Sequence, residues 1–255
     1  MNIDCISGTS SGSIVAALYA MGYNYKSIYY LFKKYFKKIK YIDGKNILKI
    51  IYGIIFKKKI IINGLNSGEI IEKIINEVAI NKNIEKISDI KNSLIIPSVD
   101  LHTGKIYFFN SQNKRKTFSD EIIYDSNINI GKAVRASCSY PLVFSPCKYN
   151  NTELIDGGIR ENIPWKGLKE LGADKVISVV FENKIDGKCC KNIIEVVNNS
   201  LNILCHELSN YEIEGADYLI KIGTKNISLL DMEKIDYLYE LGYKIMKKNI
   251  YKINK

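Results

Sequence analysis

Residues 8–12 read Gly-Thr-Ser-Ser-Gly, which places Ser10 two positions from a glycine on either side. A serine hydroxyl is a weak nucleophile, and it needs a nearby base and hydrogen-bond donors for the oxyanion that forms. A sharp turn between a strand and a helix would present it, and Gly8 and Gly12 would allow neighbouring backbone to approach. The N-terminus of the helix behind Ser10 would contribute partial positive charge where the negative charge develops. The spacing therefore predicts a nucleophile at Ser10.

The base that would activate Ser10 must come from a distant segment. In ELIDGGIRENIPW, Asp156 ends a strand-like run, and Gly157 and Gly158 follow it. The two glycines let the chain turn away while the carboxylate stays at the open end of the strand. We predict that Asp156 is the base. The alternative interpretation of Asp-Gly-Gly is a plain turn.

The two histidines supply a different alternative, the Ser–Asp–His order of an α/β-hydrolase. Ser10, Asp156 and His206 occur in that order along the chain. However, His206 falls inside a predicted helix, where a surface or packing role is the simpler interpretation. His102 falls at a predicted hairpin turn. We therefore prefer Asp156 alone as the partner of Ser10.

Strand-like and helix-like segments alternate along the chain and position these residues. The predicted strands are 2–7, 152–156, 175–181 and 216–222, with a hairpin turning around 101–105. The predicted helices are 11–21, 26–38, 46–56, 67–78, 130–138, 165–171, 191–209 and 231–248. This alternation predicts a layered α/β fold with a largely parallel sheet. Because no linker-like segment divides the chain, we predict a single domain over residues 1–255.

Residues 26–62 concentrate the positive charge of the chain. Eleven lysines against one aspartate give this segment the net charge of +10 that the whole chain has. Aromatic and isoleucine side chains alternate with the lysines, a pattern that suits an anionic membrane surface. Solvated lysines on ordinary helices are the alternative, since the whole chain is rich in Lys and Ile. Arginine is scarce and no nucleic-acid-binding motif is present, so we expect no nucleic-acid partner.

The cysteines and the N-terminus give expectations about the cellular compartment. The six cysteines include no Cys-x-x-Cys pair, and no signal-peptide pattern opens the sequence. No apolar run approaches the ~20 residues that a membrane-spanning helix needs. We therefore expect reduced thiols and a cytoplasmic protein, with peripheral membrane contact through the lysine-rich segment. We expect neither a metal nor a cofactor.

Three segments together resemble the patatin-like phospholipases of the bacterial type. ISGTSSGSIVAALYAMG resembles the nucleophile segment of that family, and AVRASCSYPLVFSP resembles its Ala-Ser…Pro…Phe-Pro segment. LIDGGIRENIP resembles its Asp-Gly-Gly motif followed by Asn-x-Pro, and DLHTGKIYFF is a weaker fourth match. The three stronger segments occur in the order of the family and span residues 3–164.

The resemblance implies a three-layer α/β/α sandwich with a mostly parallel central sheet. It implies a lipid acyl hydrolase of the phospholipase A or lysophospholipase type, in which Ser10 attacks the ester and Asp156 accepts its proton. Asn162 and Pro164 would shape the turn after the base. Residues 139–141 would form part of the substrate wall.

The resemblance also has a consequence at the N-terminus. The family carries a strand, a glycine-rich loop and a helix before the nucleophile, whereas seven residues precede Gly8 here. The resemblance therefore implies an N-terminally incomplete domain, in which the Ser11 N–H is the remaining oxyanion donor. The alternative hypothesis is a truncated or degenerate member that binds lipid or membranes without catalysis.

Overall fold

The computed structural model describes residues 3–35, 43–57, 62–112, 120–182, 189–224 and 232–253. The strands are β1 (Cys5–Ser7), β2 (Ser93–Asp100), β3 (Ile106–Asn110), β4 (Ile122–Asp125), β5 (Cys147–Tyr149), β6 (Thr152–Asp156), β7 (Ile177–Glu182) and β8 (Tyr218–Gly223). The helices are α1 (Ser11–Ala20), α2 (Tyr25–Tyr35), α3 (Gly44–Tyr52), α4 (Glu69–Ile80), α5 (Ile130–Ser137), α6 (Trp165–Glu170), α7 (Ile193–Glu212) and α8 (Ile235–Ile253). The elements predicted from the sequence are present, with ends that differ by a few residues, and β4 and β5 are additional.

A six-stranded mixed sheet forms the centre of the molecule, in the order β4-β3-β2-β6-β5, with β1 also paired to β2. β1 runs parallel to β2 and β4 runs parallel to β3, whereas the β2–β3, β2–β6 and β5–β6 pairs are antiparallel. β7 and β8 form a separate parallel pair.

The long strand β2 brings the ends of β1 and β6 together. Its one edge is covered by β3, so β1 and β6 share the other edge. β1 pairs as far as Ser7 opposite Ile95, and β6 pairs as far as Asp156 opposite Ser98. Three residues of a strand span about 10 Å. The two strands therefore end facing each other across a short stretch of β2, where both chains must turn away.

Alternate side chains of β2 enter two different cores. Leu94 and Ile96 lie in the larger core, which contains the buried residues of α1, α4 and α5. Ile95 points to the opposite face and packs with Phe108 of β3. On that face, a Cβ added at Gly167 of α6 would lie 2.7 Å from Ile95 Cδ1. Helices therefore cover both faces of the sheet, and the predicted α/β/α class is confirmed.

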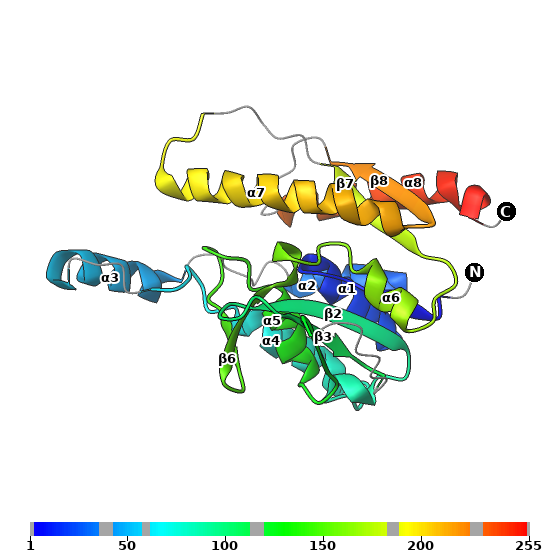
Figure 1. Cartoon of the computed structure of the whole chain (residues 1–255), viewed down its shortest axis with the longest axis horizontal. Helices are drawn as coiled ribbons and strands as arrows, with labels where there is room; N and C mark the ends of the chain where they lie inside the picture. The colour runs from blue at the N-terminus through cyan, green and yellow to red at the C-terminus, as the bar shows by residue number, and fades with distance from the viewer. Residues whose placement is uncertain are drawn as a thin grey trace.

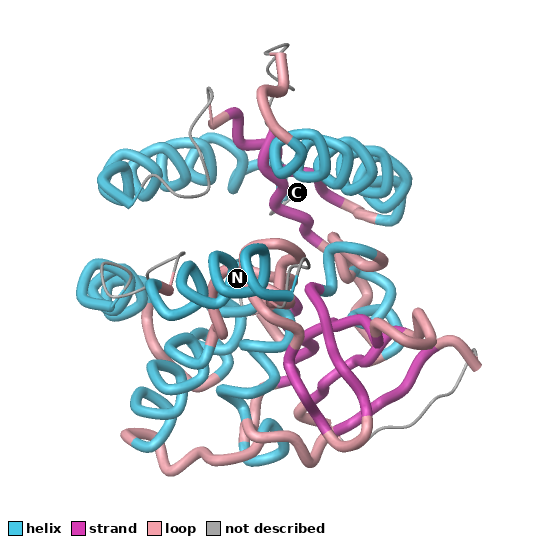
Figure 2. Tube along the Cα trace, turned by 90° about the vertical axis from the view of Figure 1, so that its left-hand side faces the viewer, coloured by secondary structure: helices cyan, strands magenta, loops and turns pink. Residues whose placement is uncertain are grey.

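The C-terminal elements form a further layer over this body. This layer consists of α7, β7, β8 and α8, which lie together along one side of the body (Figure 1). The view turned by 90° shows the same separation of α7 and α8 from the main sheet (Figure 2). α8 is joined to α2 by Asp236, whose carboxylate accepts hydrogen bonds from the Tyr29 hydroxyl at 2.6 Å and the Lys33 ammonium at 3.0 Å. The rings of Tyr29 and Tyr239 also meet, with centroids 4.4 Å apart.

The lysine-rich segment divides into two parts of different character. α2 belongs to the body, because Leu31 and Phe32 pack against the larger core and Tyr35 is buried in it. α3 and the π-helical turn η2 (Gly53–Lys57) project away from the body (Figure 1). The rest of the predicted helix 26–38, and the lysines at 58 and 59, lie outside the described residues. Within the described ranges, no helix is both long and apolar enough to cross a membrane.

Candidate active site

Ser10 lies in a strained turn between β1 and α1. Its backbone has φ 53° and ψ −127°, in the left-handed region that non-glycine residues rarely adopt. Gly8 permits the turn, because a Cβ there would lie 2.3 Å from the Gly12 carbonyl oxygen. The similar expectation for Gly12 is wrong, since a Cβ at that position would meet no atom of the described residues within 4 Å, apart from the neighbouring backbone of its own helix. Such strain is typical of functional sites.

The backbone of Ser10 is held by α1 and by the end of α5. Its N–H donates to Ser137 Oγ at 3.1 Å. Its carbonyl accepts hydrogen bonds from the Ser13 hydroxyl at 2.6 Å and from Cys138 Sγ at 3.2 Å. The Ser11 N–H, at the exposed start of α1, has no hydrogen-bond acceptor among the described residues. The turn is therefore fixed through its backbone, while one backbone donor stays available beside the Ser10 hydroxyl.

Asp156 ends β6 and is 1% exposed. Its N–H donates to the Ser139 carbonyl at 3.1 Å, and its Oδ1 accepts the Gly158 N–H at 2.8 Å. Its Oδ2 is buried and has no partner of normal hydrogen-bond geometry among the described residues. The Ser10 hydroxyl is nevertheless close enough to lower the pKa of this carboxyl. Ser137 accepts the Ser10 N–H and Ser139 accepts the Asp156 N–H, so neighbouring positions at the end of α5 hold both residues, and their side chains interact electrostatically.

Burial dominates the electrostatics of Asp156. It raises the pKa of the carboxyl from 3.8 to about 6, against the opposing effects of the Ser10 side chain and the Gly158 N–H. Burial raises the pKa values of Cys138, Tyr140 and Cys205, and the nearby Asp156 carboxylate raises them further. A carboxyl that titrates near neutrality is a better general base than an ordinary aspartate.

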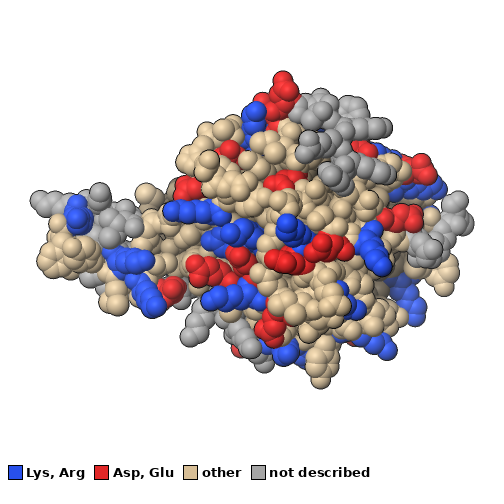
Figure 3. All heavy atoms as spheres, turned by 90° about the horizontal axis from the view of Figure 1, so that it is seen from below, with Lys and Arg blue, Asp and Glu red and all other residues tan. Residues whose placement is uncertain are grey.

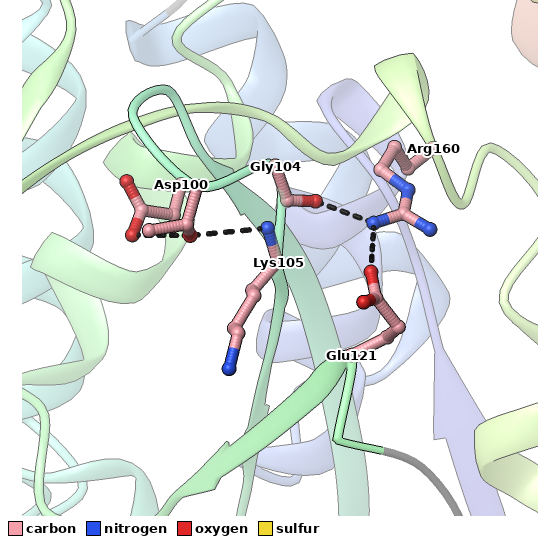
Figure 4. Close-up of polar contacts among 6 residues, drawn as sticks. Asp100, Gly104, Lys105, Glu121 and Arg160 are labelled. Atoms are coloured by element: carbon pink, nitrogen blue, oxygen red, sulfur yellow. Dashed lines mark hydrogen bonds and ion pairs between the residues drawn. The ribbon is translucent and has the colours of Figure 1, made fainter.

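The loop after Asp156 is tied to the main sheet through Arg160. Figure 4 shows the guanidinium pointing to the turn between β2 and β3 and to the start of β4. Its Nη1 donates to the Gly104 carbonyl at 2.5 Å and to the Glu121 carboxylate at 3.1 Å. In the same turn, the Asp100 N–H donates to the Lys105 carbonyl at 2.9 Å. The turn predicted around 101–105 therefore supports one side of the loop that follows Asp156.

The opposite side of this loop contacts α7. Asn162 Nδ2 donates to Ser209 Oγ at 2.6 Å, and its backbone N–H donates to Glu212 Oε1 at 3.1 Å. Cys205 Sγ lies 3.5 Å from the Gly158 carbonyl oxygen, to which it donates. Gly157 lies against β2, where a Cβ would be 2.5 Å from the Pro97 carbonyl oxygen. Packed backbone on one side and α7 on the other thus confine the two glycines and Asn162.

Several residues named from the sequence lie elsewhere or have a different surrounding. His206 is exposed on α7, and His102 Nε2 lies 3.6 Å from a Glu153 carboxylate oxygen. In the described part of the chain, neither histidine forms a hydrogen bond or ion pair with Ser10 or Asp156. Of residues 139–141, Ser139 is buried and holds the Asp156 backbone.

Sequence reasoning missed Ser137, Cys138 and Glu212. Ser137 and Cys138 lie inside the segment AVRASCSYPLVFSP, of which only residues 139–141 were given a role, as part of the substrate wall. Glu212 carries no motif and is separated from Asn162 by 50 positions. The described residues contain no cluster of three or more His, Cys, Asp or Glu that could hold a metal ion.

Comparison of the amino-acid sequence with known proteins links this chain to a family. A family model described as "Patatin-like phospholipase" matches residues 1–169. "Uncharacterized protein R571" of Acanthamoeba polyphaga mimivirus is 30% identical over 271 residues, which cover 99% of this chain and 84% of that protein. "Lysophospholipase NTE1" of Meyerozyma guilliermondii is 29% identical over 269 residues, covering 94% of this chain and 17% of that protein. "Probable lipid hydrolase 463L" of Invertebrate iridescent virus 6 is 27% identical over 166 residues, covering 62% of this chain and 50% of that protein.

Proposed function

The chain belongs to the patatin-like phospholipase family, and we propose that it hydrolyses acyl esters of phospholipids or lysophospholipids through a dyad of Ser10 and Asp156. The observation that carries the proposal is the contact between a strained nucleophile turn and a buried carboxyl whose pKa is raised to about 6. The relatives named lysophospholipase and probable lipid hydrolase support the substrate class.

In the first half of the reaction, Ser10 Oγ attacks the carbonyl carbon of the ester while its proton passes to the Asp156 carboxylate. The oxyanion that forms faces the N-terminus of α1, where the Ser11 N–H donates to it. Collapse of the tetrahedral intermediate breaks the bond to the alkoxy oxygen. Asp156 returns the proton to that oxygen, so the alcohol leaves and Ser10 carries the acyl group.

In the second half, a water molecule gives a proton to Asp156 and attacks the acyl carbonyl carbon. The bond to Ser10 Oγ breaks, and Ser10 takes the proton back from Asp156. The free fatty acid leaves and the enzyme returns to its starting state. One buried carboxyl thus acts as base and then as acid in each half.

Release of fatty acid from lysophosphatidylcholine tests this proposal. We expect hydrolysis by the wild-type chain and none by Ser10→Ala or Asp156→Asn. Ser200→Ala, an exposed serine of α7, is the matched control and should retain the wild-type rate. His206→Ala should also retain it, and a loss there would favour a histidine-dependent hydrolase. Salt-sensitive lipid binding without hydrolysis would favour the non-catalytic alternative.

We also propose that α3 and η2, rather than the whole of residues 26–62, contact an anionic membrane surface. Leu48 is 68% exposed and Phe56 is 70% exposed. Lys45, Lys49 and Lys57 are exposed on the same projection, and Figure 3 shows lysine side chains on it beside uncharged ones. Apolar side chains that enter the acyl boundary and cations that meet lipid phosphates suit such a surface.

Sedimentation with phosphatidylcholine vesicles, with and without phosphatidylserine, tests the membrane proposal. We expect binding to the anionic vesicles that weakens as salt is added. Leu48→Ser combined with Phe56→Ser should lower the affinity about 100-fold or more, since each buried side chain contributes roughly 1.5–3 kcal/mol. Phe181→Ser on β7, which removes a side chain that is 65% exposed, is the control. Equal binding by the double variant and the wild type would contradict the proposal.

A further inference from the structure

The C-terminal end of α7 holds the loop that follows Asp156 through a buried carboxylate. Glu212 is 5% exposed. Its Oε1 accepts the backbone N–H of Asn162 at 3.1 Å, and its Oε2 accepts the backbone N–H of Ile163 at 2.8 Å. Both oxygens therefore bind consecutive N–H groups of one loop, an arrangement that fixes the loop in position and in orientation.

This loop is the one that presents a hydrogen bond to Asp156. The Gly158 N–H donates to Asp156 Oδ1 at 2.8 Å. Asn162 Oδ1 borders Gly158, because a Cβ added at that glycine would lie 3.1 Å from it. The Glu161 N–H closes the loop by donating to the Gly157 carbonyl at 2.8 Å. A shift of Asn162 would thus be passed through one short turn to the donor of Asp156.

Two neighbouring contacts hold the same segments together. Asn162 Nδ2 donates to Ser209 Oγ, one turn before Glu212, at 2.6 Å. Beyond Glu212, a Cβ added at Gly215 would lie 2.0 Å from the Trp165 ring. The end of α7 therefore contacts the loop, and the turn that follows α7 contacts the start of α6.

Burying an acidic side chain at this position lowers the stability of the fold, because the carboxylate loses its hydration. Burial and the nearby Glu161 raise the pKa of Glu212 to about 7, while the two N–H groups and Lys166 oppose that change. An apolar residue would avoid the desolvation of a carboxyl. It would leave two backbone donors without an acceptor.

We propose that Glu212 is a positioning residue for Asp156, supplied by a helix outside residues 1–169 to which the family model matches. It acts through the loop and does not touch the substrate. The inference rests on the proposed function only for its effect on the rate, since its effect on the loop can be measured independently.

The test compares Glu212→Ala, Glu212→Gln and the control Glu207→Ala, which removes an exposed glutamate of the same helix. Fatty acid release gives kcat and KM, and amide hydrogen exchange gives the protection of Asn162 and Ile163. We expect Glu212→Ala to lower kcat about 10- to 100-fold with KM little changed, and to speed exchange at both amides by a similar factor. Glu212→Gln keeps one acceptor oxygen and should restore part of both losses. The control should match the wild type.

Wild-type kcat and wild-type amide protection in Glu212→Ala would overturn the proposal. If Glu212→Ala fails to fold, Glu212→Gln provides the test instead. Protection of both amides in Glu212→Gln equal to that in the wild type would then overturn the proposal. Hydrolysis that persists in Ser10→Ala would instead refute the proposed function. The exchange data would still test whether Glu212 holds the loop. Faster exchange at these two amides with wild-type kcat would also overturn the positioning role, because Glu212 would then hold the loop without affecting Asp156.

Discussion

Replacing Asp156 with asparagine should abolish hydrolysis and, at the same time, stabilise the folded protein at pH 8. The side chain is 1% exposed, and burial raises the pKa of its carboxyl to about 6. An ionised carboxylate at such a position costs free energy that a neutral amide does not. Asparagine retains an Oδ1 that can accept the Gly158 N–H, so the loop should keep its contact.

The magnitude follows from the difference between about 6 in the folded state and the ordinary pKa of 3.8. Because the folded pKa is the higher one, the unfolded state loses its proton first as the pH rises. Stability is therefore lost between the two pKa values, and the full penalty applies above about pH 6. At pH 8 the penalty is about 3 kcal/mol, and at pH 4 it falls below about 1 kcal/mol.

Urea unfolding of the wild type and Asp156→Asn at both pH values measures this penalty. The difference between the two proteins isolates Asp156 from other buried carboxyls such as Glu161 and Glu212, whose pKa values are also raised. We expect the variant to gain about 3 kcal/mol of unfolding free energy at pH 8 and little at pH 4. A gain that is the same at both pH values, or a loss at pH 8, would refute the reasoning.

Three further predictions concern the same site. Gly8→Ala should destabilise the fold by roughly 1–3 kcal/mol, because its Cβ would lie 2.3 Å from backbone, whereas Gly12→Ala should be tolerated; thermal unfolding compares the two. The rate of hydrolysis should rise with pH around 6 and then level off, since Asp156 acts as a base only when ionised; a pH–rate profile that is flat between pH 5 and 7 would contradict this. Arg160→Ala should lower kcat and loosen the loop by removing its contacts with Gly104 and Glu121, as amide exchange in the loop would show.

The elements were predictable from the sequence where their patterns were long enough. The β-branched run at 175–181 and the apolar helix at 11–21 correspond to β7 and α1. β4 and β5 were not predicted, because strands of four and three residues are too short for a hydrophobic period to be recognised. The pairing partners were not predictable, since nothing local indicates that β1 and β6 share one edge of β2. The single domain over residues 1–255 stays a prediction.

The two central residues of the candidate site were recognisable from their sequence motifs, whereas the residues that support them were not. Ser10 and Asp156 stand in recognisable glycine-rich segments, and their side chains interact electrostatically in the structure. Ser137 and Glu212 act by accepting backbone N–H groups of other residues, a role that their residue types alone do not indicate. The raised pKa of Asp156 depends on burial, which only the packed structure supplies.

Labelling with a fluorophosphonate probe, followed by mass spectrometry of the modified peptide, tests the central claim most directly. Such a probe reacts with an activated serine hydroxyl and needs no knowledge of the natural lipid. The dyad predicts that Ser10 alone is labelled, that Asp156→Asn slows the reaction about 100-fold or more, and that Ser10→Ala is not labelled. Modification of a different serine, or labelling that persists in Ser10→Ala, would contradict the assignment of Ser10 as the nucleophile.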